Sequence, residues 1–64
     1  MLLEALKLKY QSEIASAKAN IQVYIDNPVG IGEHPDLVAA VDEQIVKLAD
    51  AEDKLMALEN YLQD

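Results

Sequence analysis

The chain has 64 residues, enough for one domain, and it contains no cysteine, which excludes disulfides and thiolate metal sites. Hydrophobic residues make up 52% of it but aromatic residues only 5%, so aliphatic side chains and alanine have to fill any core. The net charge is −7 and arginine is absent, which argues against direct binding to the phosphates of DNA or RNA.

The first predicted helix covers residues 2–26. Its apolar residues recur every 3.5 positions on average, which is the period of a coiled-coil seam. This first stripe consists of Leu3, Leu6, Tyr10, Ile14, Ala17, Ile21 and Tyr24. We expect the helix to end at Asn27, because Pro28 cannot continue a helix and disfavours the helical conformation of the residue before it.

Residues 27–35 are predicted to link two helices. Two prolines stiffen this segment, and Val29 and Ile31 are expected to fold back over the end of the helix pair. His34 is the only histidine of the chain. We interpret it as a capping or surface residue, because a catalytic zinc site needs at least three convergent ligands.

The second predicted helix covers residues 35–62, with Pro35 at its first position and Asp36 in its first turn. Its main stripe alternates steps of four and three residues, and Gln44 is the one polar member. This second stripe consists of Leu37, Val41, Gln44, Leu48, Ala51, Leu55, Leu58 and Leu62, and Val38 and Ile45 lie beside it. The sequence leaves open whether Gln44 is buried and fixes the register or lies solvated at the edge.

If the link turns the chain back, the two helices form an antiparallel hairpin. The expected register places Ala17 opposite Ile45 and Tyr10 near Glu52. It also brings Lys7 within reach of Glu52. Within the second helix, Asp50 and Lys54 have the spacing of a stabilising ion pair, as do Glu43 and Lys47.

The apolar stripe of the second helix is wider than one partner helix can cover, which favours a bundle of more than two helices. For a chain of this length, the gain from burying apolar surface barely offsets the cost of ordering the chain, and oligomerisation is a common remedy. We therefore predict an all-α hairpin that forms a homo-oligomer, most simply a dimeric four-helix bundle. The members of both stripes other than Gln44, together with Val38 and Ile45, are the candidate seam.

No catalytic, cofactor or metal site is expected. The neighbouring acids Asp42 and Glu43 point about 100° apart on a helix, so they do not form a pair that shares a proton. The segment Gly30-Ile31-Gly32 lacks the preceding strand, the third glycine and the lysine of a phosphate-binding loop. We expect the protein not to be an enzyme.

The charge is distributed unevenly along the chain. Residues 1–26 hold three acids and three lysines, whereas residues 36–64 hold eight acids and two lysines, a net charge of −6. The leading hypothesis is a structural or protein-interaction module that self-associates through its seams. The alternative is an acidic adaptor or inhibitor that binds a basic protein surface in the manner of a nucleic-acid mimic. No apolar run approaches 18 residues, so we expect no membrane partner.

A resemblance to known proteins rests on two strings, Asn27-Pro28-Val29-Gly30-Ile31-Gly32-Glu33-His34-Pro35-Asp36-Leu37 and Ala51-Glu52-Asp53-Lys54-Leu55. These strings are similar to those of short uncharacterised helical-hairpin proteins of T4-like marine phages. The resemblance covers residues 20–58, and the residues before it show only a generic amphipathic helix. It implies expression in the cytoplasm of an infected bacterium, and it implies no activity for any residue.

Overall fold

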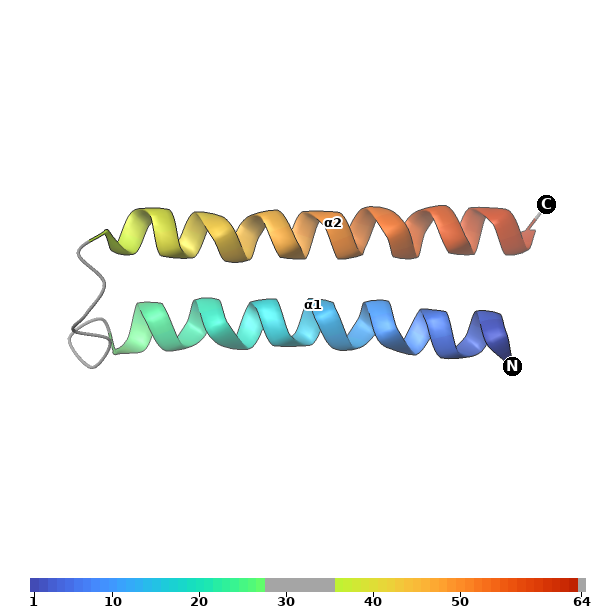
Figure 1. The fold of residues 1–64 in the computed structure, drawn as a ribbon, viewed down its shortest axis with the longest axis horizontal. Helices are drawn as coiled ribbons and strands as arrows, with labels where there is room; N and C mark the ends of the chain where they lie inside the picture. Colours follow the sequence, from blue (N-terminus) through green and yellow to red (C-terminus); the bar gives the residue numbers. More distant parts are fainter. Residues whose placement is uncertain (28–35, 64) are drawn as a thin grey trace.

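The computed structural model describes residues 1–27 and 36–63. Helix α1 (Leu2–Asp26) and helix α2 (Leu37–Gln63) lie side by side and run in opposite directions (Figure 1). The predicted all-α helical hairpin is thereby confirmed. The expectations for Val29, Ile31, His34 and Pro35 fall on residues 28–35, outside the described residues.

The boundaries of α1 are those predicted, but α2 begins later than expected. Asp36 precedes the helix and caps it, because its carboxylate Oδ1 accepts a hydrogen bond from the Ala39 N–H at 3.0 Å. Its carbonyl also accepts the Ala40 N–H at 3.2 Å. Placing Asp36 inside the first turn was therefore wrong, because the helix begins at Leu37, two residues later than predicted. An aspartate at the N-cap satisfies a backbone donor that the first turn leaves unpaired.

Small residues form the closest contact between the helices. Among the described residues, the buried hydrophobic side chains are Ala17, Ala40, Ala51 and Leu58, and three of these four are alanines. Alanine lets two helices approach closely, but it removes little apolar surface from water. Apart from Leu58, the larger aliphatic residues of both stripes flank this contact and stay half-buried or exposed.

The register between the helices differs from the predicted one by two residues. Tyr10 lies near Lys54, whose Nζ is 6.0 Å from the centre of the tyrosine ring, and not near Glu52. Gln44 faces α1, where Asn20 Nδ2 donates a hydrogen bond to its Oε1 at 3.1 Å. Ile45, expected opposite Ala17, is 45% exposed. This register gives the Gln44 amide oxygen a hydrogen-bond donor, and it leaves the next residue, the apolar Ile45, outside the contact between the helices.

Two ion pairs occur within the described residues, one within α1 and the other within α2. Lys9 pairs with Glu13 at 3.1 Å, and Lys54 pairs with Asp50 at 2.9 Å. The Asp50–Lys54 pair was predicted, whereas the expected contact between Lys7 and the acids of α2 does not form at 4.0 Å or less. The polar contact that joins the two helices in this register is therefore the hydrogen bond between Asn20 and Gln44. Within the described residues, no ion pair links α1 to α2.

The hairpin is a flat rod with dimensions of 47 × 17 × 14 Å. Its radius of gyration is 14.6 Å, compared with about 10.7 Å for a globular domain of this length. Its accessible surface is 4947 Å², compared with about 4,100 Å² for a compact protein of this mass. A rod of two helices therefore leaves two broad faces open, one of which is turned toward the viewer in Figure 1.

Candidate interaction surface

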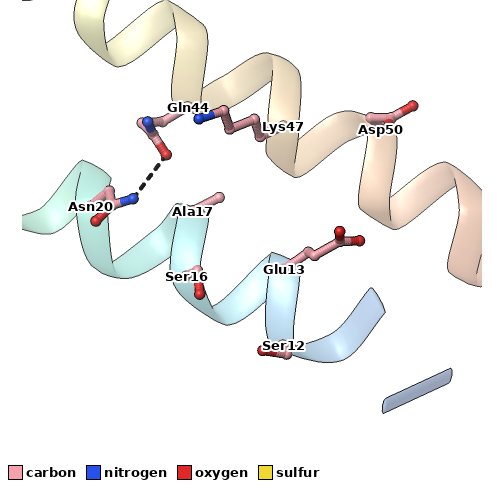
Figure 2. A pocket seen from close by; sticks show the side chains of 8 residues that line it. All are labelled: Ser12, Glu13, Ser16, Ala17, Asn20, Gln44, Lys47 and Asp50. Carbon is pink, nitrogen blue, oxygen red and sulfur yellow. Dashed lines mark hydrogen bonds between the residues drawn. The ribbon is translucent and has the colours of Figure 1, made fainter. Parts of the chain in front are cut away.

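The two broad faces of the hairpin carry different side chains. One face has a hollow lined by Ile14, Lys18, Glu52, Leu55, Met56, Glu59, Asn60 and Gln63. The opposite face has a hollow lined by Ser12, Glu13, Ser16, Ala17, Asn20, Gln44, Lys47 and Asp50 (Figure 2). Residues seven positions apart share a face in a coiled-coil pair, so Ile14, Lys18, Glu52 and Leu55 assign their heptad neighbours to the same face.

The face with Ile14 and Leu55 continues as a strip of aliphatic residues along the whole rod. We call it the apolar face and define it as Ile14, Ile21, Ile25, Val38, Val41, Ile45, Leu48, Leu55 and Leu62. Within it, Val38 is 82% exposed and Ile25 is 63% exposed. A run of aliphatic side chains left open to water at this scale is the usual mark of an interaction site.

Charged residues accompany the apolar face in an uneven pattern. On α1 they are Lys7 and Lys18, with Glu4 near the end, and on α2 they are Glu52 and Glu59. None of the five takes part in an ion pair of 4.0 Å or less within the described part of the chain. The α1 edge of the apolar face is therefore net positive, and its α2 edge is negative.

We call the opposite face, with the hollow lined by Ser12, Glu13, Ser16, Ala17, Asn20, Gln44, Lys47 and Asp50, the polar face. Val23, which is 55% exposed, lines a second hollow beside Asn20 and Gln44. Figure 2 shows Asn20 of α1 and Gln44 of α2 pointing toward one another across the contact between the helices. Gln44 is only 8% exposed, so of the two alternatives left open by the sequence, the buried one is correct. Among the described residues, no buried side-chain nitrogen or oxygen lacks a hydrogen-bond partner. The polar hollow thus offers no orphaned group to a ligand.

Tyr10 lies between two lysines on this side of the molecule. The Nζ atoms of Lys9 and Lys54 are 5.8 Å and 6.0 Å from the centre of its ring. Lys54 also donates to Asp50, and this hydrogen bond, reinforced by the charge of Asp50, raises the pKa of Lys54 above its ordinary value of 10.5. Lys54 therefore joins the surface of α2 to an aromatic ring of α1.

The predicted seam residues fall into three groups in the hairpin. Ala17, Ala51 and Leu58 are buried. The half-buried group consists of Leu6, Tyr10, Ile14, Ile21, Tyr24, Leu37, Val41, Leu48 and Leu55. The exposed group consists of Leu3, Val38, Ile45 and Leu62. The single chain therefore uses its alanines and Leu58 for its own contact and leaves much of the remaining seam uncovered.

Sequence reasoning missed Ala40, which is buried in the contact. Ala40 lies three residues after Leu37 and four before Gln44, which is the spacing of residues on one helical face. This spacing indicated an inward position for Ala40. The neighbouring residue Val41 matched the strict heptad pattern and carries the larger side chain, so it was assigned to the stripe instead. In a closely packed helix pair the small residue takes the inner position.

Residues 1–27 and 36–63 show neither a cluster of metal ligands nor a membrane-spanning helix. This part of the chain contains no group of three or more histidine, cysteine, aspartate or glutamate residues that could hold a metal ion. Neither α1 nor α2 is apolar enough over the required length to cross a bilayer.

Comparison of the chain with protein families, with curated proteins and with solved structures gave no match. The similarity to helical-hairpin proteins of T4-like marine phages, and the cytoplasmic location it implies, therefore stay predictions.

Proposed function

We propose that this protein is a non-enzymatic interaction module whose hairpins self-associate through the apolar face to form a dimeric four-helix bundle. The observation that carries the proposal is the composition of the core. Its buried apolar residues, within the described chain, are three alanines and Leu58, while Ile25, Val38 and Ile45 stay exposed to water. Such a core contributes little stability, so covering the apolar face is the largest remaining source of stabilisation.

The size of the open surface matches the needs of a dimer. The broad face measures 47 Å by 17 Å, or about 800 Å², and a standard protein interface buries about 800 Å² on each partner. The accessible surface of the hairpin also exceeds that of a compact protein of its mass by about the same amount. Pairing two hairpins face to face would bring the surface of each chain close to the value for a compact domain.

Sedimentation equilibrium over a concentration series tests the proposal directly. The chain has a mass of 7.1 kDa, and we expect a reversible shift to twice that mass at micromolar concentrations. The thermal midpoint should rise with protein concentration, because dimerisation stabilises the folded state by mass action. A folded species that keeps the monomer mass at the highest concentrations would contradict the proposal.

A second candidate function is supported by the acids of α2. Asp42, Glu43, Glu52, Asp53 and Glu59 are exposed and take part in no ion pair within the described chain. A dense acidic surface favours association with a basic partner that weakens as salt is added. This candidate is an acidic adaptor that binds a basic protein surface.

A pull-down from bacterial lysate at low and high salt tests the adaptor hypothesis. The matched variant carries Asp42→Asn, Glu43→Gln and Asp53→Asn, which remove charge and preserve side-chain size. We expect the native chain to retain a basic protein at low salt and the variant to lose it. Equal recovery by both chains, or no recovery by either, would exclude this function.

A further inference from the structure

We infer that the apolar face is covered by the same face of a second copy, with α1 of each chain lying against α2 of its partner. In this arrangement both hairpins point the same way along the rod. The inference rests on the proposed self-association and adds the face and the orientation of the two copies.

The apolar face is favoured over the polar face because of what each would lose on contact. The polar hollow contains Glu13, Lys47 and Asp50, whose charges would have to be taken out of water. Removing charged groups from water costs several kcal/mol unless each gains a well-placed partner. The hollow on the apolar face also holds three charged residues, Lys18, Glu52 and Glu59, but in the inferred arrangement they meet charges of opposite sign. Ile45, Leu48 and Ile21 also belong to the apolar face, and their burial is favourable.

Two identical hairpins can stack the apolar face on itself with twofold symmetry in two ways. If the twofold axis runs along the rod, α1 lies on the partner's α2, and both hairpins have their chain ends at the same extremity. If the axis runs across the rod, α1 lies on the partner's α1 and α2 on the partner's α2, with the chain ends at opposite extremities. Neighbouring helices are antiparallel in both cases, so helix dipoles do not distinguish them.

The charges beside the apolar face do distinguish the two arrangements. When α1 lies on the partner's α2, the net positive edge with Lys7 and Lys18 meets the negative edge with the partner's Glu52 and the partner's Glu59. When each helix lies on its own counterpart, Glu52, two residues from the middle of α2, comes within about 6 Å along the axis of the level of the partner's Glu52. The lysines of α1 then meet no acid of α2. Juxtaposed like charges disfavour an interface, whereas complementary ones fix its register.

The level of one pair of these charges along the rod also agrees. An axis along the rod keeps every residue of the partner at the level it has in its own chain. Asn20 lies level with Gln44, so Lys18 is about 9 Å along the axis from the level of the partner's Glu52. Lys7 is three residues before Tyr10, and Tyr10 lies level with Lys54. This puts Lys7 within about 3 Å, along the axis, of the level of Glu59.

Two adjacent residues of α2 give a matched test of the face. Ile45 belongs to the apolar face, whereas Val46 is 61% exposed and points about 100° away from Ile45 around the helix. We expect Ile45→Lys to weaken dimerisation at least about tenfold, because the lysine would be buried without a partner. Val46→Lys should change it less than about twofold. Circular dichroism monitors whether both variants stay helical.

The outcomes separate the inference from the proposed function. If the native chain dimerises and both variants dimerise equally well, the face is wrong and self-association stands. If the native chain stays monomeric, self-association itself is wrong. If only Val46→Lys breaks the dimer, the interface lies on another side of α2, which also overturns the inference.

A spin label tests the orientation, and the lack of cysteine makes single labelling straightforward. Ala39 is exposed near the start of α2 and faces away from the apolar face, so Ala39→Cys places one label near one end of each hairpin. With helix axes about 10 Å apart, hairpins that point the same way place the two labels about 25–30 Å apart. Hairpins that point in opposite directions place them about 40 Å apart, and that distance in pulsed dipolar spectroscopy would overturn the inference.

A charge exchange tests the electrostatic argument without changing net charge. The variant combines Lys7→Glu, Lys18→Glu, Glu52→Lys and Glu59→Lys. In the inferred arrangement it pairs with itself but places like charges against the native chain. We expect native mass spectrometry of the variant mixed with ¹⁵N-labelled native chain to show mixed dimers reduced about tenfold below statistical mixing. Statistical mixing, or an excess of mixed dimers, would contradict the inferred orientation.

Discussion

At the scale of single residues, the hydrogen bond between Asn20 and Gln44 joins the two helices and accompanies their register. Gln44 is a polar residue at a position where every other member of its stripe is apolar. A polar residue at such a position selects one alignment at some cost in stability, because any slip leaves its amide unpaired. The side chain of Asn20 is the donor that makes this alignment acceptable.

Replacing Asn20 tests this contact. We expect Asn20→Ala to lower the free energy of unfolding by about 1–2 kcal/mol, because the buried Gln44 oxygen would lose its donor. Urea denaturation at fixed protein concentration measures the change. The control is Ser12→Ala, which removes an exposed polar side chain from α1 and should have an effect of less than about 0.5 kcal/mol. Equal effects would mean that the Asn20–Gln44 bond contributes nothing specific.

Lys54 provides a prediction about pH. The hydrogen bond and charge of Asp50 raise the pKa of Lys54 above 10.5. A raised pKa means that the folded state holds this proton more tightly, so the resulting stabilisation is complete below pH 10.5 and is lost as the pH rises through the raised pKa. The side chain is exposed, so the effect on stability is small and the titration itself is the better readout.

The titration of Lys54 can be followed by NMR of its side-chain carbon resonances. We expect Asp50→Asn to lower its pKa toward 10.5, since the hydrogen bond to the carboxylate is replaced by a weaker one to a neutral amide oxygen and the charge of Asp50 is removed. Glu43→Gln removes an exposed acid from the same helix away from Lys54 and serves as control. If the two variants move the pKa equally, the shift arises from overall charge and not from the Asp50 contact.

At the scale of the helices, the two rods approach closely because alanines lie between them. Ala17 and Ala51 are each only 2% exposed. We expect Ala51→Leu to lower the free energy of unfolding by about 1–3 kcal/mol, because the added atoms would force the helices apart. Ala19→Leu is the control, since Ala19 is exposed on α1 and leucine is also a good helix former. Chemical denaturation measures the free energy of unfolding of both variants. If Ala51→Leu left it unchanged, the contact between the helices would be loosely packed.

Much of each helix could be read from the sequence, because apolar residues repeat at the coiled-coil period and Pro28 follows directly on the end of α1. The register could not be read in the same way. Moving one helix along the other by two residues leaves both stripes facing inward, so periodicity alone barely distinguishes the alternatives. The deciding contact, Asn20 with Gln44, involves a residue that belongs to neither apolar stripe.

The candidate surface was predictable only in part. The width of the second stripe indicated that apolar residues would stay uncovered, and Val38 and Ile45 are indeed exposed in the hairpin. Which residues of the two helices share one broad face depends on the register and on the rotation of each helix. The pattern therefore predicted that a surface would be open without predicting its outline or the charges beside it.

At the scale of the whole molecule, net charge opposes assembly. Each chain carries −7, so two copies repel one another over distances longer than the contacts beside the apolar face. We expect the dissociation constant of the dimer to fall several-fold between low and physiological salt, because screening reduces this repulsion. Sedimentation at several salt concentrations measures it. A dimer that weakens strongly with salt would show that ion pairs between the chains outweigh the repulsion.

The first turn of α1 and the last turn of α2 lie at the same extremity of the rod (Figure 1). In a bundle whose hairpins point the same way, all four polypeptide termini would gather at one pole. The two ends of such a bundle would differ, and cargo fused to any terminus would be displayed only at the end that carries the termini. The other end and the sides of the bundle would then stay free for attachment to a solid support.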